Sequence, residues 1–267
     1  YDILIGGAGA DSYIYGRGDG NDVIDDELAA EVGDILQFAD NIERAEIIFN
    51  KSSDEKDLII KFANNPADSI TIKNQQYNDA SKIEMIVFDN GDQAIDLSKK
   101  TIIADEDSNI QINLDTIEQE RILNNNISLL ATYGSAIYND DTGLISYVPN
   151  SNFNGIDQLS YNIIDAEGNI SRTNNINIFI TPINDNPIGS VANIETMIND
   201  NFSINLLELF SDVEDDDLTL LVNVQNQIGL PDYLNFDQET GILSGAINKN
   251  GKTIIEETAS DQQGGIY

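Results

Sequence analysis

The sequence predicts an all-β protein assembled from several small modules. Its aliphatic and β-branched residues come in short alternating runs, and clusters of Asn, Asp and Gly separate these runs at about the spacing of sandwich strands. Sustained helical periodicity is scarce, and the best helical candidate is the stretch DELAAEV at 26–32. The clearest strand candidates are 57–62, 69–73, 109–114, 158–163, 175–181, 202–207 and 218–224.

The composition limits the kinds of site that this chain can form. It has 47 acidic and 13 basic residues, a formal net charge of −34, no His and no Cys. Repulsion on this scale opposes a compact fold unless cations intervene, and it makes nucleic acid and anionic membranes poor partners. Ser-His-Asp and Cys-His catalytic sites are excluded, as is metal ligation by His or Cys. A metal would have oxygen ligands, which favours calcium.

Location cannot be read from disulfides, because the chain has no Cys to form them. The sequence shows neither a signal peptide nor an apolar run long enough for a membrane span. Because it starts and stops inside recognisable patterns, we expect a segment of a longer protein, with a last domain that is truncated.

The glycine-rich stretch at 6–24 allows three interpretations. A dinucleotide-binding turn would need a third glycine where Ser12 stands and a helix directly afterwards, but Tyr13, Ile14, Tyr15 and Gly16 follow instead. A flexible linker would not place large apolar residues so regularly. The third interpretation is a nine-residue repeat.

Residues 6–14 fit the nonapeptide G-G-x-G-x-D-x-U-x, in which U is a large apolar residue. Residues 1–5 read as the tail of a preceding unit, and a decaying unit begins at Tyr15. The glycines allow sharp turns that point carbonyls inward, and the Asp adds a carboxylate for the same cation. The candidate metal ligands of this region are Asp2, Gly7, Gly9, Asp11, Gly16, Gly18, Asp19 and Asp22.

This repeat resembles those of the RTX (haemolysin-type calcium-binding) proteins, which are secreted by bacteria. The resemblance covers about the first 24 residues and implies a short parallel β-roll, at 1–32, with calcium between its turns. Residues 33–97 resemble the β-rich region that commonly follows such repeats, through the D-x-L-x-F pattern at 34–38 and the strand candidates after it. We expect 33–100 to cap the roll and to carry no chemistry.

The remaining residues resemble two kinds of sandwich module. The ADEDSN opening, the F-x-G-x-D-x-L-x-Y run at 153–161 and the NDNP ending resemble the cadherin-like tandem repeats of large bacterial surface proteins, which implies an immunoglobulin-size sandwich at 101–187. Residues 188–267 carry LPDYLNFD and TGILSG, which resemble the dystroglycan-type cadherin-like domain. Both resemblances imply antiparallel sandwiches.

Acidic residues gather where these modules should meet. A polar linker at 184–186 precedes Pro187, and in classical cadherins a similar linker binds calcium together with acids of both neighbouring domains. An L-D-R-E element is absent, and the competing interpretation is that these acids are solvated turn residues. The candidate calcium ligands are Asn184, Asp185 and Asn186, with Asp165 and Glu167 upstream, Asp212, Glu214 and Asp216 downstream, and Asp105 and Asp107 at the preceding junction.

These patterns predict a calcium-binding, non-catalytic segment of a large secreted or surface-attached bacterial adhesin. The alternative is a set of accessory modules of a secreted hydrolase or protease whose catalytic domain lies elsewhere. The expected partners are calcium and, through other parts of the parent chain, a host-cell, biofilm, glycan or protein surface. No catalytic residue, nucleic-acid partner or direct membrane insertion is expected.

Overall fold

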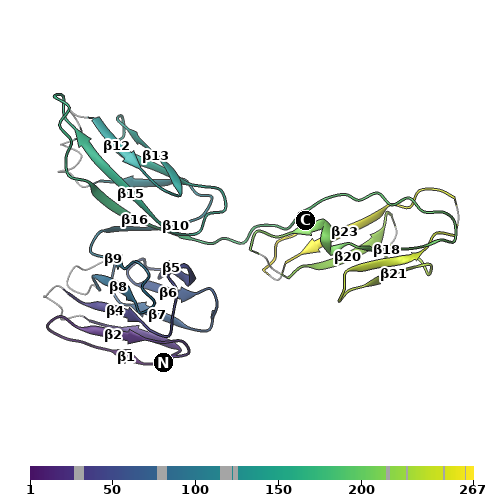
Figure 1. Ribbon diagram of the computed structural model, residues 1–267, viewed down its shortest axis with the longest axis horizontal. Helices are drawn as coiled ribbons and strands as arrows, with labels where there is room; N and C mark the ends of the chain where they lie inside the picture. The colour runs from purple at the N-terminus through teal and green to yellow at the C-terminus, as the bar shows by residue number, and fades with distance from the viewer. Residues whose placement is uncertain are drawn as a thin grey trace. The chain divides into compact units, whose positions relative to one another are not determined.

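The computed structural model describes residues 1–26, 33–76, 83–114, 122, 126–214, 217–226, 228–248, 250–261 and 263–267 (Figure 1). The all-β prediction is confirmed, because these residues form short strands joined by turns, with 3-10 turns at Arg44–Glu46 and Leu207–Leu209. Except for Asp26, the predicted helical stretch at 26–32 lies outside the described residues. Within the described ranges, no helical segment has the length and hydropathy needed to cross a bilayer.

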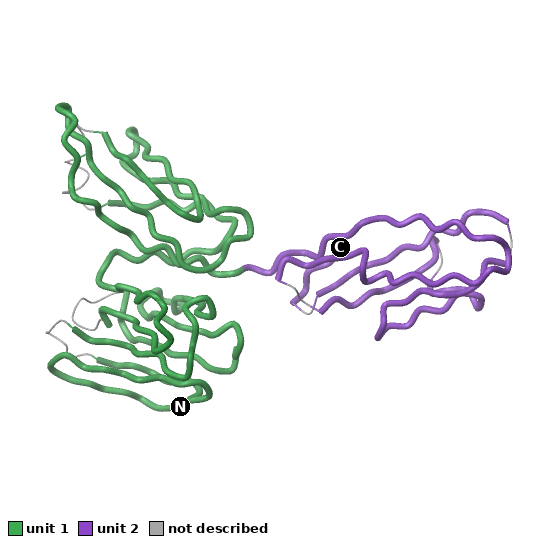
Figure 2. Tube along the Cα trace, viewed as in Figure 1, with its two compact units in different colours: residues 1–182 green, residues 183–267 purple. Residues whose placement is uncertain are grey.

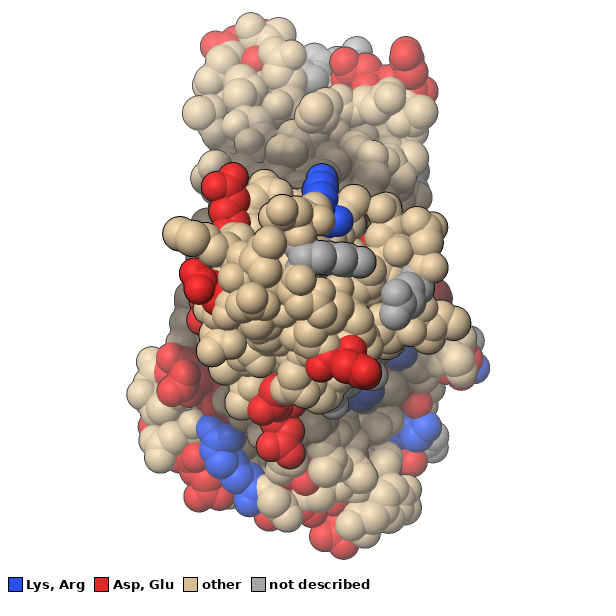
Figure 3. Space-filling view, turned by 90° about the vertical axis from the view of Figure 1, so that its right-hand side faces the viewer, with Lys and Arg blue, Asp and Glu red and all other residues tan. Residues whose placement is uncertain are grey.

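The chain divides into two compact units, residues 1–182 and residues 183–267 (Figure 2). Unit 1 contains two buried apolar clusters, one in its roll and one in its sandwich, and unit 2 contains a third. Acidic side chains are dispersed over the face shown in Figure 3 rather than gathered in one patch. Net charge alone therefore does not locate a site.

The N-terminal part of unit 1 is a parallel roll closed by antiparallel strands. The first four strands, β1 to β4, alternate between two sheets, and each four-residue strand buries every second side chain. The first sheet has the order β1 (Ile3–Leu4), β3 (Asn21–Ile24), β7 (Ser69–Ile72), β6 (Leu58–Phe62) and β5 (Ile47–Lys51). The second has the order β2 (Ser12–Tyr15), β4 (Ile35–Phe38), β8 (Met85–Phe88) and β9 (Ile95–Asp96).

Aromatic residues fill the interior of the roll. Tyr15 stacks on Phe62 with ring centroids 5.4 Å apart, and Phe38 meets both rings edge-on. Phe38 is fully buried. Because these rings come from β2, β4 and β6, they join the first turns of the roll to the strands that follow them, and this packing fixes where the loops between the strands emerge.

The second part of unit 1 is a two-sheet sandwich. One sheet has the order β10 (Lys100–Asp105), β16 (Asn174–Thr181), β15 (Gly155–Ile164) and β12 (Asn126–Leu130). The other has the order β11 (Ile110–Asn113), β14 (Leu144–Pro149) and β13 (Gly134–Asn139). The predicted antiparallel arrangement holds for every pair except β10 and β16, which are parallel. No hairpin joins these two edge neighbours, so nothing requires them to be antiparallel.

The roll and the sandwich of unit 1 pack against each other. Phe179 of β16 stacks on Phe49 of β5 with centroids 3.9 Å apart and belongs to the apolar cluster of the roll. The Asn177 side chain donates to the carbonyl of Asp96 at 2.7 Å. The last strand of the sandwich therefore helps to bury the strands that close the roll.

Unit 2 is an antiparallel β-structure with a smaller core. Its pairs are β17 (Ile188–Gly189) with β19 (Phe210–Ser211), β22 (Ile242–Ala246) with both β18 (Asn201–Asn205) and β21 (Leu234–Asp237), and β20 (Thr219–Val224) with β23 (Ile255–Ser260). The buried apolar residues are Leu206, Leu220, Val222, Leu234, Leu243 and Ala259. Partly buried apolar residues such as Phe202, Ile204 and Phe210 pack against this core.

Candidate calcium sites

The parallel pairing of β2 with β4 brings acidic side chains together at one edge of the roll. In this register Ser12 lies beside Ile35, so the residues before them, Asp11 and Asp34, are also neighbours. Asp26, which follows β3 on the same edge, completes the group. The three carboxylates offer oxygens that all lie within 4.8 Å of one another. We call Asp11, Asp26 and Asp34 the loop-1 edge site.

Hydrogen bonds hold this cluster in place. The backbone N–H of Asp11 donates to Asp34 Oδ1 (2.8 Å), and that of Gly7 donates to Asp26 Oδ1 (3.0 Å). The Tyr13 hydroxyl donates to Asp26 Oδ2 at 2.6 Å. Gly7 reaches this position with a φ of 92°, in the left-handed region that favours glycine. The glycine-rich loop therefore positions the acids through its backbone.

Two oxygens of the loop-1 edge site, Asp11 Oδ2 and Asp34 Oδ2, are buried and accept no hydrogen bond from the protein. Asp34 is 0% exposed and Asp26 is 2% exposed. Burial raises the pKa of the Asp34 carboxyl, the hydrogen bond from Asp11 N–H lowers it in part, and the nearby charges of Asp26 and Glu84 raise it further. Buried carboxylates are costly without a counter-charge. The site therefore fits a hard divalent cation with oxygen ligands.

Asp26 and Asp34 were not among the predicted ligands, and Asp34 belongs to the region 33–100 for which no chemistry was expected. Asp34 opens the D-x-L-x-F pattern of the capping region, yet its side chain lies at the edge of the repeat turns. Glu84, also from this region, accepts the N–H groups of Gly33 (3.0 Å) and Asp34 (2.7 Å) and fixes the turn. Parallel pairing places Asp34 beside Asp11 although 23 positions separate them.

The other predicted ligands of the roll lie mostly at the opposite edge, in the loop between β2 and β3. Gly9 belongs to the first loop and has a φ of 121°. At the opposite edge, backbone N–H groups donate from Gly16 to Asp19 Oδ2 (2.8 Å), from Gly18 to Asp68 Oδ2 (2.9 Å) and from Asp2 to Asp22 Oδ1 (2.8 Å). These carboxylate oxygens already accept hydrogen bonds, unlike the unpartnered oxygens of the loop-1 edge site.

A second group of unpartnered oxygens lies in unit 2. Asn184 Oδ1, Asp185 Oδ2, Asp212 Oδ2 and Glu214 Oε1 are all buried and accept no hydrogen bond from the protein. The N–H of Asp185 donates to Glu214 Oε2 at 3.2 Å, which joins the start of the unit to the turn after β19. Burial raises the pKa of Glu214, and the N–H of Asp185 lowers it in part. We call these four residues the unit-2 site, although among the described residues three acidic side chains come within 4.8 Å of one another only at the loop-1 edge site. The predicted ligand Asp216 lies outside the described residues.

Asp261 is a further member of the unit-2 site that sequence analysis did not select. Its Oδ2 accepts the Asn184 amide at 3.0 Å, and this bond is the main reason that its pKa is lowered. Its Oδ1 accepts the N–H groups of Gln263, Gly264 and Gly265. An acid followed by a Gly-Gly pair was visible in ASDQQGG, but only a turn was predicted from it.

The remaining predicted ligands occupy separate turns. Asp165 accepts the N–H groups of Glu167 (3.0 Å) and Asn169 (2.8 Å), so its carboxylate caps a local turn and the pKa is lowered mainly by Asn169. Asp105 Oδ1 accepts the Thr181 hydroxyl. The N–H of Asn152 donates to Asp107 Oδ1, and the N–H of Ile266 donates to Asn186 Oδ1. These hydrogen bonds hold Asp105, Asp107 and Asp165 at separate turns and do not bring them into one site.

Two family models match parts of unit 1. Residues 78–179 match the bacterial Ig domain. Residues 57–92 match the haemolysin-type calcium binding protein related domain. The first match spans the sandwich and the strands before it, and the second spans β6, β7 and β8. These parts of unit 1 are therefore similar to a bacterial Ig domain and to a domain related to haemolysin-type calcium-binding proteins.

Comparisons with other proteins add little to these matches. None of the curated proteins matches the chain. Three solved structures resemble it weakly. They are Drosophila OTK extracellular domains 3–5 (13% identity, TM-score 0.33, 62% of this chain and 60% of that one), an endo-fucoidan hydrolase of glycoside hydrolase family 107 (14%, 0.27, 83% and 36%) and Drosophila N-cadherin EC1-3 (11%, 0.26, 99% and 96%). The chain thus spans less than two thirds of the first two.

Proposed function

We propose that this chain is a calcium-stabilised, non-catalytic segment of a secreted or surface-attached bacterial adhesin. The observation that carries the proposal is the loop-1 edge site, where three carboxylates converge at a buried edge and two of their oxygens have no protein partner. The match of neighbouring residues 57–92 to a calcium-binding related domain supports calcium as the ion. The bacterial Ig match supports an adhesion-type module.

Calcium would act on this fold by neutralising carboxylates that are otherwise costly to bury. Extracellular calcium modules bind with dissociation constants of about 0.1 to 1 mM. At about 10 mM external calcium, one such site would stabilise the folded state by roughly 1.4 to 2.7 kcal/mol. At the far lower free calcium of a cytosol this contribution is lost, so the roll would close only after export.

The unit-2 site gives calcium a second role, at the start of the last module. Its ligands would come from the segment Asn184–Asp185, from the turn with Asp212 and Glu214, and from Asp261 after β23. An ion bound there would tie the entry of the chain into unit 2 to two of its turns. Because the core of unit 2 is small, this tie would contribute a large share of its stability. Calcium-stiffened modules would then present a binding end carried elsewhere in the parent protein.

Calorimetry on the whole chain tests the proposal. Wild-type protein is melted in EGTA, in calcium and in magnesium, beside the double variant Asp11→Asn with Asp34→Asn. Asp141→Asn serves as the control, because Asp141 lies in an exposed turn between β13 and β14. We expect calcium to raise the melting temperature of the wild type and the control, and magnesium to raise it much less. In the double variant, calcium should leave the melting temperature of the roll unchanged. Superimposable wild-type melts in EGTA and calcium would refute the proposal.

A further inference from the structure

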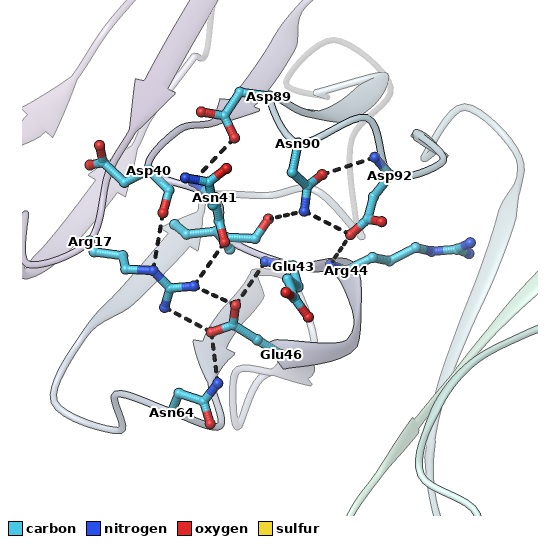
Figure 4. A network of polar contacts seen from close by, with 11 residues as sticks. Arg17, Asp40, Asn41, Glu43, Arg44, Glu46, Asn64, Asp89, Asn90 and Asp92 are labelled. Atoms are coloured by element: carbon cyan, nitrogen blue, oxygen red, sulfur yellow. Dashed lines mark hydrogen bonds and ion pairs between the residues drawn. The ribbon is translucent and has the colours of Figure 1, made fainter.

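Arg17 connects the loop between β2 and β3 to the turn between β4 and β5 (Figure 4). Its guanidinium donates Nε–H to the carbonyl of Asp40 (3.2 Å) and Nη2–H to the carbonyl of Asn41 (2.9 Å). It also forms a two-point contact with Glu46, through Nη1 to Oε2 (2.8 Å) and Nη2 to Oε1 (2.5 Å). Two backbone carbonyls and a carboxylate therefore surround the Arg17 guanidinium, which is a cation supplied by the protein itself.

The oxygens around this cation have little capacity left for another. Glu46 is 6% exposed and also accepts the N–H of Glu43 (2.8 Å) and the Asn64 amide (3.1 Å). The hydrogen bonds from Arg17 are the main reason that the pKa of Glu46 falls to about 2. A buried, ionised carboxylate is thus fully paired at this edge, whereas Asp11 and Asp34 keep unpartnered oxygens at the other.

The turn that Arg17 holds is strained. Asp40 and Asn41 have φ values of 56° and 54°, so two successive non-glycine residues occupy the left-handed region. Such a conformation persists only where its surroundings enforce it. Arg17 enforces this conformation by donating hydrogen bonds to both carbonyls. Asp89 Oδ1 also accepts the N–H of Asn41 at 3.2 Å. The planar, permanently charged guanidinium suits three oxygen groups held in fixed positions.

Backbone carbonyls together with a carboxylate are the oxygen set that a hard cation takes in proteins. We propose that Arg17 fills an oxygen-lined cation site with its own guanidinium, so that this edge of the roll closes without metal while the loop-1 edge site requires it. Arg17 is thus a residue that determines where the roll takes calcium. The second half of this inference rests on the proposed function, and the first half stands on the contacts of Arg17 alone.

Because only the loop-1 edge site needs a metal ion, we expect the two edges of the roll to respond differently to chelation. In EGTA the turn held by Arg17 stays closed, and the strands that cap the roll are already in place. Calcium then closes only the edge with Asp11, Asp26 and Asp34. The roll would therefore have a metal-independent half that prepares the other half for the ion.

Hydrogen–deuterium exchange on the whole chain, in EGTA and in calcium, tests this inference. We expect calcium to slow exchange at least about tenfold at the amides of Gly7, Asp11 and Asp34, but less than about twofold at those of Asn41 and Glu43. Arg17→Gln should speed exchange at Asn41 and Glu43 about tenfold in both conditions, because the carbonyls and Glu46 lose a charged donor. Equal slowing of exchange by calcium at both edges of the wild type would overturn the inference.

Two controls separate the possible causes. Arg44→Gln removes a nearby arginine whose side chain donates a long, 3.5 Å hydrogen bond to Gln93, and it should leave exchange at the amides of Asn41 and Glu43 unchanged. Arg17→Lys keeps the charge but loses the fork and should fall between wild type and Arg17→Gln. Native-like exchange at unit 2 amides serves as the folding control for Arg17→Gln. If that control holds and exchange at Asn41 is also unchanged, the inference is refuted. A lack of calcium effect at Asp11 with an intact effect of Arg17→Gln would refute the proposed function, and with it the calcium half of the inference, but not the half that rests on the contacts of Arg17.

Discussion

The Tyr13 hydroxyl donates a 2.6 Å hydrogen bond to Asp26 Oδ2 and accepts one from the backbone N–H of Gly6 at 2.9 Å. Tyr13 is 7% exposed, and burial together with the Asp26 carboxylate raises the pKa of its phenol. The ring belongs to the apolar core of the roll while its hydroxyl reaches the loop-1 edge site. Core packing and ligand orientation are thus joined in one side chain.

Replacing Tyr13 by Phe should therefore weaken calcium binding without unfolding the roll. The ring still packs, but Asp26 loses the Tyr13 hydroxyl, one of the two donors that hold its carboxylate. The loss of such a supporting bond typically lowers metal affinity about 10-fold to 100-fold. Calcium titration followed by calorimetry measures the change. Tyr15→Phe is the matched control, because its hydroxyl donates to Gly20 at the opposite edge. Equal losses in both variants would contradict the assignment of Asp26 to the site.

Asp34→Asn should stabilise the chelated protein and abolish the calcium response of the roll, while unit 2 keeps its own response. The substitution removes a buried charge that has an unpartnered oxygen and lies close to Asp11 and Asp26. Relief of this repulsion should raise stability in EGTA by about 1 kcal/mol or more. Urea unfolding in EGTA and in calcium gives both values. A variant that is less stable than wild type in EGTA would show that Asp34 is a structural acid rather than a ligand.

The sequence allowed the inward-facing residues of the roll to be predicted, because the nonapeptide fixes which position follows the Asp on a strand. The period places Leu4, Tyr13 and either Val23 or Ile24 as large apolar residues. Tyr13 and Ile24 are buried, and Leu4 and Val23 are half-buried. The loop-1 edge site was predicted only in part. Asp11 lies within the motif, but Asp26 and Asp34 join it through parallel strand pairing and not through the repeat. Pairing partners of this kind are not visible in a local pattern.

The unit-2 site shows the same limit. Asn184, Asp185, Asp212 and Glu214 were selected from a resemblance, and each has a buried oxygen that accepts no hydrogen bond from the protein. Asp261 was missed because an acid before Gly-Gly is also an ordinary turn signal. What distinguishes it is the tertiary bond with Asn184, which sequence alone cannot supply.

Asp157 is a buried acid for which we predict a structural role. It is 2% exposed and accepts the Tyr147 hydroxyl (2.7 Å) and the N–H groups of Thr132 and Tyr133 (3.2 and 3.0 Å). Asp157→Asn would turn an amide donor toward these donors, so we expect a loss of about 2 to 4 kcal/mol of unfolding free energy, equal in EGTA and calcium. Urea unfolding measures it, with the exposed Asp141→Asn as control. A loss seen only in calcium would contradict this role.

Asp261→Ala should remove the calcium response of unit 2 and leave that of unit 1. The change deletes the acceptor of three backbone N–H groups and the partner of Asn184. Exchange of unit 2 amides in EGTA and calcium measures the effect. Asp237→Ala is the control, because Asp237 also caps a turn, through the N–H groups of Glu239 and Thr240, but is not part of the site. Loss of the response in both variants would mean that unit 2 responds to general weakening.

Glu46 should make the roll acid-sensitive. Its pKa of about 2 in the folded protein lies below the ordinary 4.5, mainly because of the hydrogen bonds from Arg17, and Asp40 and Glu43 are the other charges near the guanidinium. A depressed carboxyl pKa stabilises the fold above the unfolded value, and this contribution is lost as the pH falls from about 4.5 toward 2. The shift corresponds to at most about 3 kcal/mol. Urea unfolding of wild type and Glu46→Gln in EGTA, at several pH values from 7 to about 3, should show a difference that narrows with acid. A difference independent of pH would mean that the Arg17 and Glu46 contact contributes through packing and not through charge.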